Sequence, residues 1–291
     1  MRILTAGLCL ATLSSTVQAE VPLSSASSGH LTVPTIINGA GPYHFVIDTG
    51  AEGSAVYDWF SRARRLAPRA GPAVELQGQT GRSDVASTTI REVVLDGRRA
   101  ANIDAVILPD RADGVRLPGI VGLDVLGDYV ADFNFLKAKL TLHPRGTPAA
   151  ALGVRFHRVA AERLRGGLLG LPVRINGTNG VAVLDTGARD SRINWRFAAA
   201  AGLRPDSPGL VDDGAIQGAT NMPMMSRRGR VGDVWLGDFV RRNVSTRIVD
   251  LPVFDAFGVG DRPAMILGMD LLRDTRMVVD FHNAEVWFAT S

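Results

Sequence analysis

Apolar and polar residues alternate with a period of two over much of the chain, for example in residues 74–97 and 215–238. This is the period of a β-strand with one buried face. Two segments depart from it, because Tyr57–Leu66 and Trp195–Ala201 have helical spacing and Gly202 follows the second as a helix stop. The pattern predicts an all-β fold with a few short helices.

The strand pattern is written twice. Leu31–Ala51 resembles Leu169–Ala188, since each reads as an apolar strand, an Asn-Gly pair and a second apolar strand. Asn-Gly between alternating apolar runs is typical of a β-hairpin. Further along, Gly119–Asn134 resembles Ala264–Asn283, each with two apolar residues, a glycine and an aspartate before a short helix-like turn and another strand. These matches predict an internal duplication.

The duplication divides the chain into an N-terminal half, residues 20–146, and a C-terminal half, residues 153–291. The Pro- and Gly-bearing stretch His143–Gly153 is expected to join them. Ahead of the first repeat, the Ser-rich segment 24–30 is expected to be a flexible lead-in.

Residues 1–19 have the features of a secretory signal peptide. Arg2 precedes the short apolar run Ile3–Leu13, and small residues lead to a cleavage point after Ala19. The segment predicts a periplasmic or secreted protein without a membrane span in the mature chain, and an uncleaved anchor is the alternative. The single cysteine, Cys9, lies within this segment, so the mature chain would hold no thiol and no disulfide.

Each half carries Asp-Thr-Gly-Ala directly after an apolar strand, at 48–51 and at 185–188. One such triplet is a weak motif, because all three residues favour turns. Here it occurs twice at matching positions, and each copy is followed by an apolar-apolar-Gly segment, at 120–122 and 266–268. Together these motifs resemble the aspartic peptidases. The alanine after each glycine is typical of the retropepsin-like branch of this family. The whole sequence resembles a bacterial-type secreted member that carries two such halves in one chain.

The resemblance covers nearly the whole mature chain and implies two pseudo-symmetric closed barrels in an acid-protease fold. It implies an aspartic-type endopeptidase, a hydrolase that cleaves peptide or protein substrates as a monomer without a cofactor. The catalytic residues would be Asp48 and Asp185. In the family, the Thr of each triplet bonds to the opposite loop and the Gly permits a tight turn; the corresponding supporting residues are Thr49, Gly50, Thr186 and Gly187.

The doubling has a physical reason. Two carboxyls about 3 Å apart cannot both ionise in a poorly solvated site, so they share one proton and titrate as a pair. Each half supplies one of them. Ala51 and Ala188 cannot donate the hydroxyl hydrogen bond by which a Ser or Thr would lower the pKa of the pair. We therefore expect activity from mildly acidic to near-neutral pH.

Glycine-bearing hairpin tips are candidate flaps over the substrate. They lie at 77–81 and 217–220, and an ordinary hairpin tip is the alternative in each case. None of the three tyrosines falls there, although pepsin-like relatives carry a flap tyrosine. Three methionines near the second flap either line the groove or pack. The flap residues expected to contact substrate are Gln77, Gly78, Gln217 and Gly218, and the methionines are Met222, Met224 and Met225.

Other chemistry has little support in the sequence. The five histidines lack metal-site spacing, and no Gly-rich phosphate loop is present. The net charge is only +3, and the densest basic run, residues 62–69, is interpreted as a solvated helix face, so a nucleic-acid partner is not expected. Asp124 and Asp270 follow the apolar-apolar-Gly segments and are expected to be helix N-caps or structural partners.

Two further readings remain open at this stage. The chain could be a noncatalytic member of the same fold that binds peptides or proteins. Alternatively, each half could pair with a half of another chain.

Overall fold

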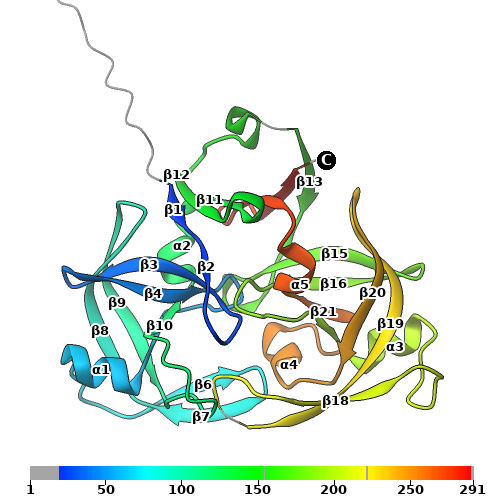
Figure 1. The fold of residues 1–291 in the computed structure, drawn as a ribbon, viewed down its shortest axis with the longest axis horizontal. Coiled ribbons are helices and arrows are strands. Elements are labelled where there is room, and N and C mark those ends of the chain that lie inside the picture. Colours follow the sequence, from blue (N-terminus) through cyan, green and yellow to red (C-terminus); the bar gives the residue numbers. More distant parts are fainter. Residues whose placement is uncertain (1–19, 154, 221, 290–291) are drawn as a thin grey trace, which may run out of the picture.

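Residues 20–153, 155–220 and 222–289 are described in the computed structural model. Two closed rings of strands lie side by side, and a third sheet lies across one end of both (Figure 1). The predicted all-β fold with two pseudo-symmetric halves is confirmed. The predicted signal peptide, residues 1–19, lies outside the described residues.

The N-terminal barrel is a ring in the order β3-β4-β10-β5-β9-β8, which closes because β8 also pairs with β3. A short strand, β2, adds to β3 at the edge. Its strands are β2 (Ser24–Ser25), β3 (Leu31–Ile37), β4 (Ala40–Ile47), β5 (Ala55–Tyr57), β8 (Ser87–Leu95), β9 (Arg98–Leu108) and β10 (Gly119–Val121).

The C-terminal barrel repeats this ring as β15-β16-β21-β17-β20-β19, which closes through a pairing of β15 with β19. Two further strands, β14 and β18, extend its sheet. Its strands are β14 (Glu162–Arg163), β15 (Leu169–Ile175), β16 (Thr178–Leu184), β17 (Arg192–Ile193), β18 (Val211–Ile216), β19 (Met224–Leu236), β20 (Phe239–Ile248) and β21 (Ala264–Leu267).

The third sheet takes three strands from each half, in the order β1-β12-β11-β22-β23-β13. Across its centre Arg276 donates two hydrogen bonds to the buried carboxylate of Asp132, at 2.9 and 2.6 Å. The two halves are therefore joined by a shared sheet as well as by the linker. The strands are β1 (Val21–Pro22), β11 (Tyr129–Asn134), β12 (Lys139–Pro144), β13 (Phe156–Ala160), β22 (Arg276–Asp280) and β23 (Glu285–Ala289).

The predicted Asn-Gly hairpins are present in both barrels. Asn38 and Gly39 have φ of 50° and 77°, and Asn176 and Gly177 have φ of 46° and 80°. Positive φ at both central residues is what a two-residue turn matched to the strand twist requires, and Asn-Gly tolerates it. Each turn sets the register of the hairpin whose second strand, β4 or β16, leads to an Asp-Thr-Gly loop.

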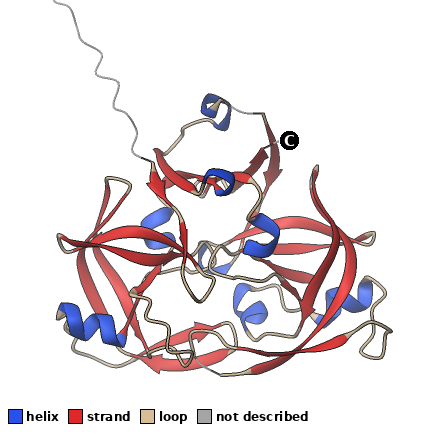
Figure 2. Ribbon diagram, in the orientation of Figure 1, coloured by secondary structure: helices blue, strands red, loops and turns tan. Residues whose placement is uncertain are grey.

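Short helices lie around the barrels (Figure 2). The two helices predicted from the sequence are present as α1 and α3. The helices are α1 (Asp58–Arg64), α2 (Leu123–Leu126), α3 (Trp195–Ala200), α4 (Val253–Phe257) and α5 (Met269–Leu272), with 3-10 turns η1 (Phe135–Lys137), η2 (Ala149–Leu152) and η3 (Arg165–Gly167).

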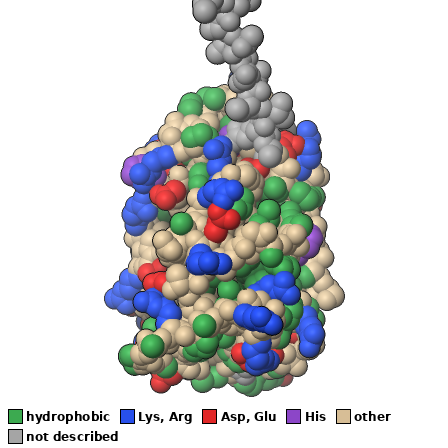
Figure 3. Space-filling model, turned by 90° about the vertical axis from the view of Figure 1, so that its left-hand side faces the viewer, with side chains coloured by type: hydrophobic (Ala, Val, Ile, Leu, Met, Phe, Trp, Pro, Cys, Tyr) green, Lys and Arg blue, Asp and Glu red, His purple; other side chains and the backbone are tan. Residues whose placement is uncertain are grey.

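The basic run, residues 62–69, begins in the last turn of α1 and is solvated, as expected. The side chain of Arg62 is 65% exposed and pairs with Asp58 one turn earlier, and Arg69 pairs with Asp104 at 2.6 Å. Figure 3 shows that Lys and Arg side chains on this side of the molecule are scattered, with Asp and Glu among them. No helix in the described part of the chain is long and apolar enough to cross a membrane.

The Ser-rich segment before the first repeat is not a flexible lead-in, contrary to expectation. Ser24 and Ser25 pair with β3, and a turn closes between Ala26 and His30 through a backbone hydrogen bond of 2.9 Å. Composition favoured flexibility, but the segment gains a strand partner that local sequence does not reveal.

Candidate active site

The two predicted catalytic aspartates stand at the ends of central barrel strands, Asp48 after β4 and Asp185 after β16. The backbone N–H of Asp48 donates to the carbonyl of Val121 at 3.0 Å, and that of Asp185 to the carbonyl of Leu267 at 3.1 Å. Strands β10 and β21 run parallel to β4 and β16 behind the loops. Each aspartate is therefore fixed by the rigid part of its barrel.

Reciprocal hydrogen bonds lock the two loops together. The hydroxyl of Thr49 donates to the carbonyl of Leu184 at 3.0 Å and accepts from the N–H of Thr186 at 3.1 Å. In the mirror arrangement, the hydroxyl of Thr186 donates to the carbonyl of Ile47 at 2.8 Å and accepts from the N–H of Thr49 at 3.1 Å. Both threonines are buried. The structure thus places Thr49 and Thr186 in the supporting arrangement that the resemblance implied.

The glycines of the triplets let the loops approach each other. A Cβ on Gly50 would lie 2.6 Å from Cγ of Asp185, and a Cβ on Gly187 would lie 2.2 Å from Oδ2 of Asp48. Any side chain at these positions would therefore displace the opposite carboxyl. Backbone N–H groups also face the carboxyls, because Gly50 donates to Asp48 Oδ1 and Ala188 to Asp185 Oδ1, both at 2.8 Å.

The two carboxyls form a hydrogen-bonded pair with raised pKa. Burial, then the charge of Asp185, raises the pKa of Asp48 well above the ordinary value of an aspartate. Burial also raises the pKa of Asp185, but the charge of Arg192 acts against that rise. The hydrogen bond between them raises the pKa of Asp48 and lowers that of Asp185. The two carboxyls therefore titrate as a coupled pair that shares one proton, and Arg192 favours the ionised form of Asp185.

Two side chains beside Asp185 were not named as site residues from the sequence, although Gln79 lies within the predicted flap 77–81. Gln79, at the tip of the first flap, donates from Nε2 to Asp185 Oδ2 at 3.1 Å. Arg192 donates from Nη1 to Oε1 of Gln79 at 2.6 Å, so the three side chains form a chain. Arg192 is 6% exposed and lies at the start of β17, where the first repeat has Ala55. When the two repeats are aligned, Arg192 stands out as a charged residue at a strand position where the first repeat has alanine.

Asp124 and Asp270 serve as structural partners in equivalent ways. Each accepts hydrogen bonds from the backbone N–H and the hydroxyl of a serine behind its active-site loop, at 2.9 and 2.6 Å for Ser54 and at 2.8 and 2.6 Å for Ser191. The alternative expectation of helix N-caps is wrong. The caps of α2 and α5 are the preceding glycines, and the aspartates lie in the first turn.

Both barrels carry a flap, and the flaps touch. The first is the hairpin β6 (Val74–Gly78) and β7 (Gly81–Val85), and the second connects β18 and β19. The N–H of Gly218 donates to the hydroxyl of Thr80 at 3.3 Å, and that hydroxyl lies 3.4 Å from the hydroxyl of Thr220. The tips therefore meet across the site, as drawn below the barrels in Figure 1.

The flap residues named from sequence differ in position. The side-chain amide of Gln77 donates to the main-chain oxygens of Gly78 and Gly81 in its own hairpin. Gly78 is buried against Thr220, and Gln217 is exposed. Among the methionines, Met225 is 69% and Met222 is 45% exposed, and Met224 packs beside the core.

A cleft of about 670 Å³ opens between the loops and the flaps. Both aspartates line it, with Asp185 at 3% exposure and Asp48 more open to the cleft. Gln77, Gly78, Gln217 and Gly218 all contribute to its walls, whereas none of the three methionines does.

No group of three or more His, Cys, Asp or Glu is arranged to hold a metal ion within the residues that the structure describes. The chemistry that the site offers is that of a proton-sharing carboxyl pair, in which one member is an acid and the other a base.

A family model matches both halves of the sequence. The sequence matches the family described as Aspartyl protease over residues 33–125 and 171–271. Each matched segment lies in one barrel and contains one Asp-Thr-Gly triplet. A search of the curated proteins returns no match.

Proposed function

Because the chain belongs to the aspartyl protease family, we propose that it is an endopeptidase that hydrolyses peptide bonds with water activated between Asp48 and Asp185. The observation that carries the proposal is the pairing of the two carboxyls. They come from different barrels and are held by reciprocal threonine hydrogen bonds. Such rigid support is what a reaction with little geometric tolerance needs.

The unequal environments of the two carboxyls support distinct roles. Asp185, ionised beside Arg192 and Gln79, removes a proton from a water molecule held between the carboxyls. Asp48 donates its proton to the carbonyl oxygen of the scissile peptide as the water oxygen bonds to the carbonyl carbon. The resulting gem-diol then collapses. One hydroxyl of the gem-diol gives its proton to Asp48, and the departing nitrogen takes from Asp185 the proton that came from the water molecule. Asp48 is then protonated and Asp185 ionised, as at the start.

The flaps set the order of events. Gln79 occupies the space above Asp185, so the first flap must withdraw before a peptide can reach the pair. After binding, closure of both tips would exclude bulk water, which strengthens electrostatic interactions in the cleft.

We also propose export of the protein as a monomer. The support for export is the signal-like pattern of residues 1–19. One chain supplies both carboxyls, so the site needs no second copy. Gel filtration of residues 20–291 and cell fractionation test these two points, and a dimer or a cytoplasmic location would contradict them.

Cleavage of a peptide library by purified residues 20–291 tests the activity. We expect cleavage within unfolded polypeptide, inhibition by a statine-type transition-state analogue, and loss of cleavage in Asp48→Asn and Asp185→Asn. A protein that binds the statine analogue but cleaves no peptide would be the noncatalytic binder. A protein that does neither would overturn the proposal.

A further inference from the structure

The two walls of the cleft are built from equivalent strand pairs with different chemistry. In the N-terminal barrel β5 runs parallel to β9, and Ala55 pairs with Val106. In the C-terminal barrel β17 runs parallel to β20, and Arg192 pairs with Arg247. All four residues line the cleft. A pair of guanidinium groups thus stands where the other wall has two small apolar side chains.

The adjoining loops extend this difference. Four residues after the first aspartate the chain has Glu52, and four residues after the second it has Arg189. Both line the cleft. We call Arg189, Arg192 and Arg247 the arginine wall.

Arg192 is a buried cation whose hydrogen bonds go to neutral acceptors. Its Nη1 donates to Oε1 of Gln79 at 2.6 Å, and its Nη2 and Nε donate to the main-chain oxygen of Asp190 at 3.0 and 3.3 Å. Over the described ranges, no carboxylate lies within 4.0 Å of its nitrogens. A buried charge without a bonded counter-ion is costly, and burial lowers the pKa of Arg192 accordingly.

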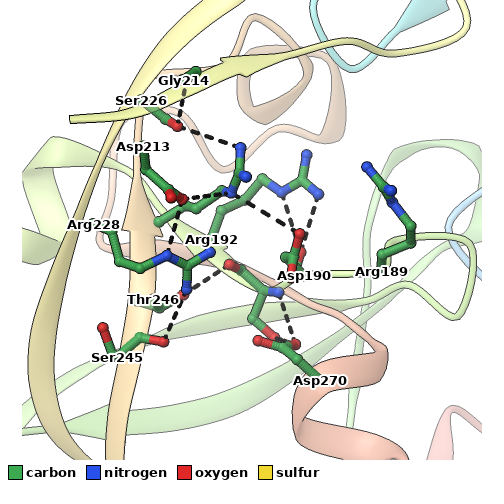
Figure 4. A network of polar contacts seen from close by, with 12 residues as sticks. Arg189, Asp190, Arg192, Asp213, Gly214, Ser226, Arg228, Ser245, Thr246 and Asp270 are labelled. Carbon is green, nitrogen blue, oxygen red and sulfur yellow. Dashed lines mark hydrogen bonds and ion pairs between the residues drawn. The ribbon is translucent and has the colours of Figure 1, made fainter. Parts of the chain in front are cut away.

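The carboxylates nearby are already shared, as Figure 4 shows. Asp213 accepts from Nε of Arg228 and lies 2.9 Å from Nε of Arg247. The carboxylate of Asp190 lies 3.9 Å from Arg247, and that of Asp270 is held by Ser191. Arg189 donates to the main-chain oxygen of Ser28 at 2.9 Å. The carboxylates of Asp190 and Asp213 are therefore engaged by Arg228 and Arg247, and the hydrogen bonds of Arg189 and Arg192 go to neutral oxygens.

Gln79 shows what fits between the arginine wall and the aspartates. Its single carboxamide spans the gap, with its oxygen on Arg192 and its nitrogen on Asp185. When the flap withdraws, Arg192 loses the acceptor on Nη1. A substrate carboxylate oxygen in that place would make a charge-assisted hydrogen bond, which is stronger than the bond to a neutral amide.

We propose that the arginine wall is a subsite for a carboxylate side chain, an Asp or Glu of the substrate that directly flanks the scissile bond. The opposite wall, with Ala55 and Val106, takes an apolar side chain on the other flank. This specificity rests on the proposed peptidase function and goes beyond it, since the carboxyl pair by itself selects no side chain.

Matched peptides test the subsite in the wild-type protein. Each pair differs only by Glu or Gln at one of the two residues flanking the cleaved bond. We expect kcat/KM to be about 10- to 100-fold higher for Glu at one of these positions, because a desolvated guanidinium discriminates strongly against a neutral isostere. Equal values at both positions would overturn the subsite.

Variants assign the preference to Arg192. Arg192→Gln should reduce the Glu-to-Gln ratio to within about twofold, whereas Arg192→Lys should keep part of it. Because the ratio compares two peptides on one preparation, partial loss of folded protein cancels. Arg242→Gln is the matched control, since it removes an arginine from β20 that is 67% exposed and does not line the cleft. An unchanged ratio in Arg192→Gln would contradict the assignment.

A binding measurement separates this inference from the proposed function. Asp48→Asn keeps the arginine wall, and its affinity for the same peptides is measured by fluorescence anisotropy. Tighter binding of the Glu peptide supports the subsite even if the wild type cleaves nothing. Equal binding of the two peptides overturns the subsite even if the wild type is an active peptidase. The same binding measurement decides between these outcomes if Arg192→Gln fails to fold.

Discussion

The loop after β4 and the loop after β16 follow the same course but contribute different side chains. Both place an aspartate, a threonine bonded to the opposite loop, and a glycine against the opposite carboxyl. Beyond the triplets they diverge, because the second loop leads to Arg189 and Arg192 and the first to Glu52 and Ala55. Backbone symmetry brings the carboxyls together, and side-chain asymmetry gives them different surroundings, since Arg192 favours the ionised form of Asp185.

The largest expected effect removes the shared chemistry. Asp48→Asn and Asp185→Asn should each lower kcat by at least about 10³-fold, because an acid and a base are both needed and they act as a unit. The double variant should be no worse than either single one. Single-turnover kinetics measure this. A residual rate within about tenfold of the wild type in either single variant would contradict the need for both carboxyls.

The second test removes the reciprocal hydrogen bonds of one threonine at a time; we call these four hydrogen bonds the threonine lattice. Thr49→Val and Thr186→Val each lose two buried hydrogen bonds, so each should lower the free energy of unfolding by about 2 kcal/mol. Activity should fall about 10- to 100-fold as the carboxyls lose alignment. Urea unfolding and kcat/KM measure the two effects.

The corresponding Thr→Ser variants are the controls for this test. They keep the hydroxyl and should stay near wild type in both stability and activity. A large effect at one threonine with none at the other would show that the lattice does not support both loops equally.

Local patterns were sufficient to predict the symmetric part of the molecule. The Asn-Gly turns, the strand alternation and the triplets are short local patterns, and each recurs in the second half of the chain, so the duplication and both aspartates could be found from the sequence. The third sheet could not, because its strands alternate like any others and nothing local indicates that β11 pairs with β22 across the halves.

The asymmetric part was beyond sequence reasoning for a related reason. Arg192 and Gln79 are 113 positions apart and meet only when the first flap folds over the second loop. In a two-residue strand such as β17, alternation carries no signal that separates a buried arginine from a surface one. The signal that did exist was the mismatch of Arg192 with Ala55 in the aligned repeats.

A third test removes the charge that distinguishes the loops. Arg192 favours the ionised form of Asp185, so Arg192→Gln should raise the pKa of Asp185 further. Ionised Asp185 is the proposed base, and the acidic limb of the kcat/KM profile should therefore move to higher pH. The wild-type profile should span mildly acidic to near-neutral pH, since both carboxyls have raised pKa.

The exposed-arginine variant Arg242→Gln is the control for this profile and should leave both limbs in place. A wild-type maximum at strongly acidic pH would contradict the raised pKa of the pair. An unmoved acidic limb in Arg192→Gln would show that the proton is placed by something other than this arginine.

The smallest expected effect concerns the flaps, where the same comparison applies. Gln79 bonds to Asp185 and Arg192, whereas Gln217, in the second flap, is exposed. Gln79→Ala frees the site of a bound carboxamide and also removes a contact that holds the first flap closed. KM should therefore change several-fold in Gln79→Ala and less than about twofold in Gln217→Ala, with kcat affected less than KM. Equal changes in KM from the two substitutions would mean that the flaps act symmetrically. The asymmetry of the two loops would then be confined to the cleft wall and would not extend to the flaps.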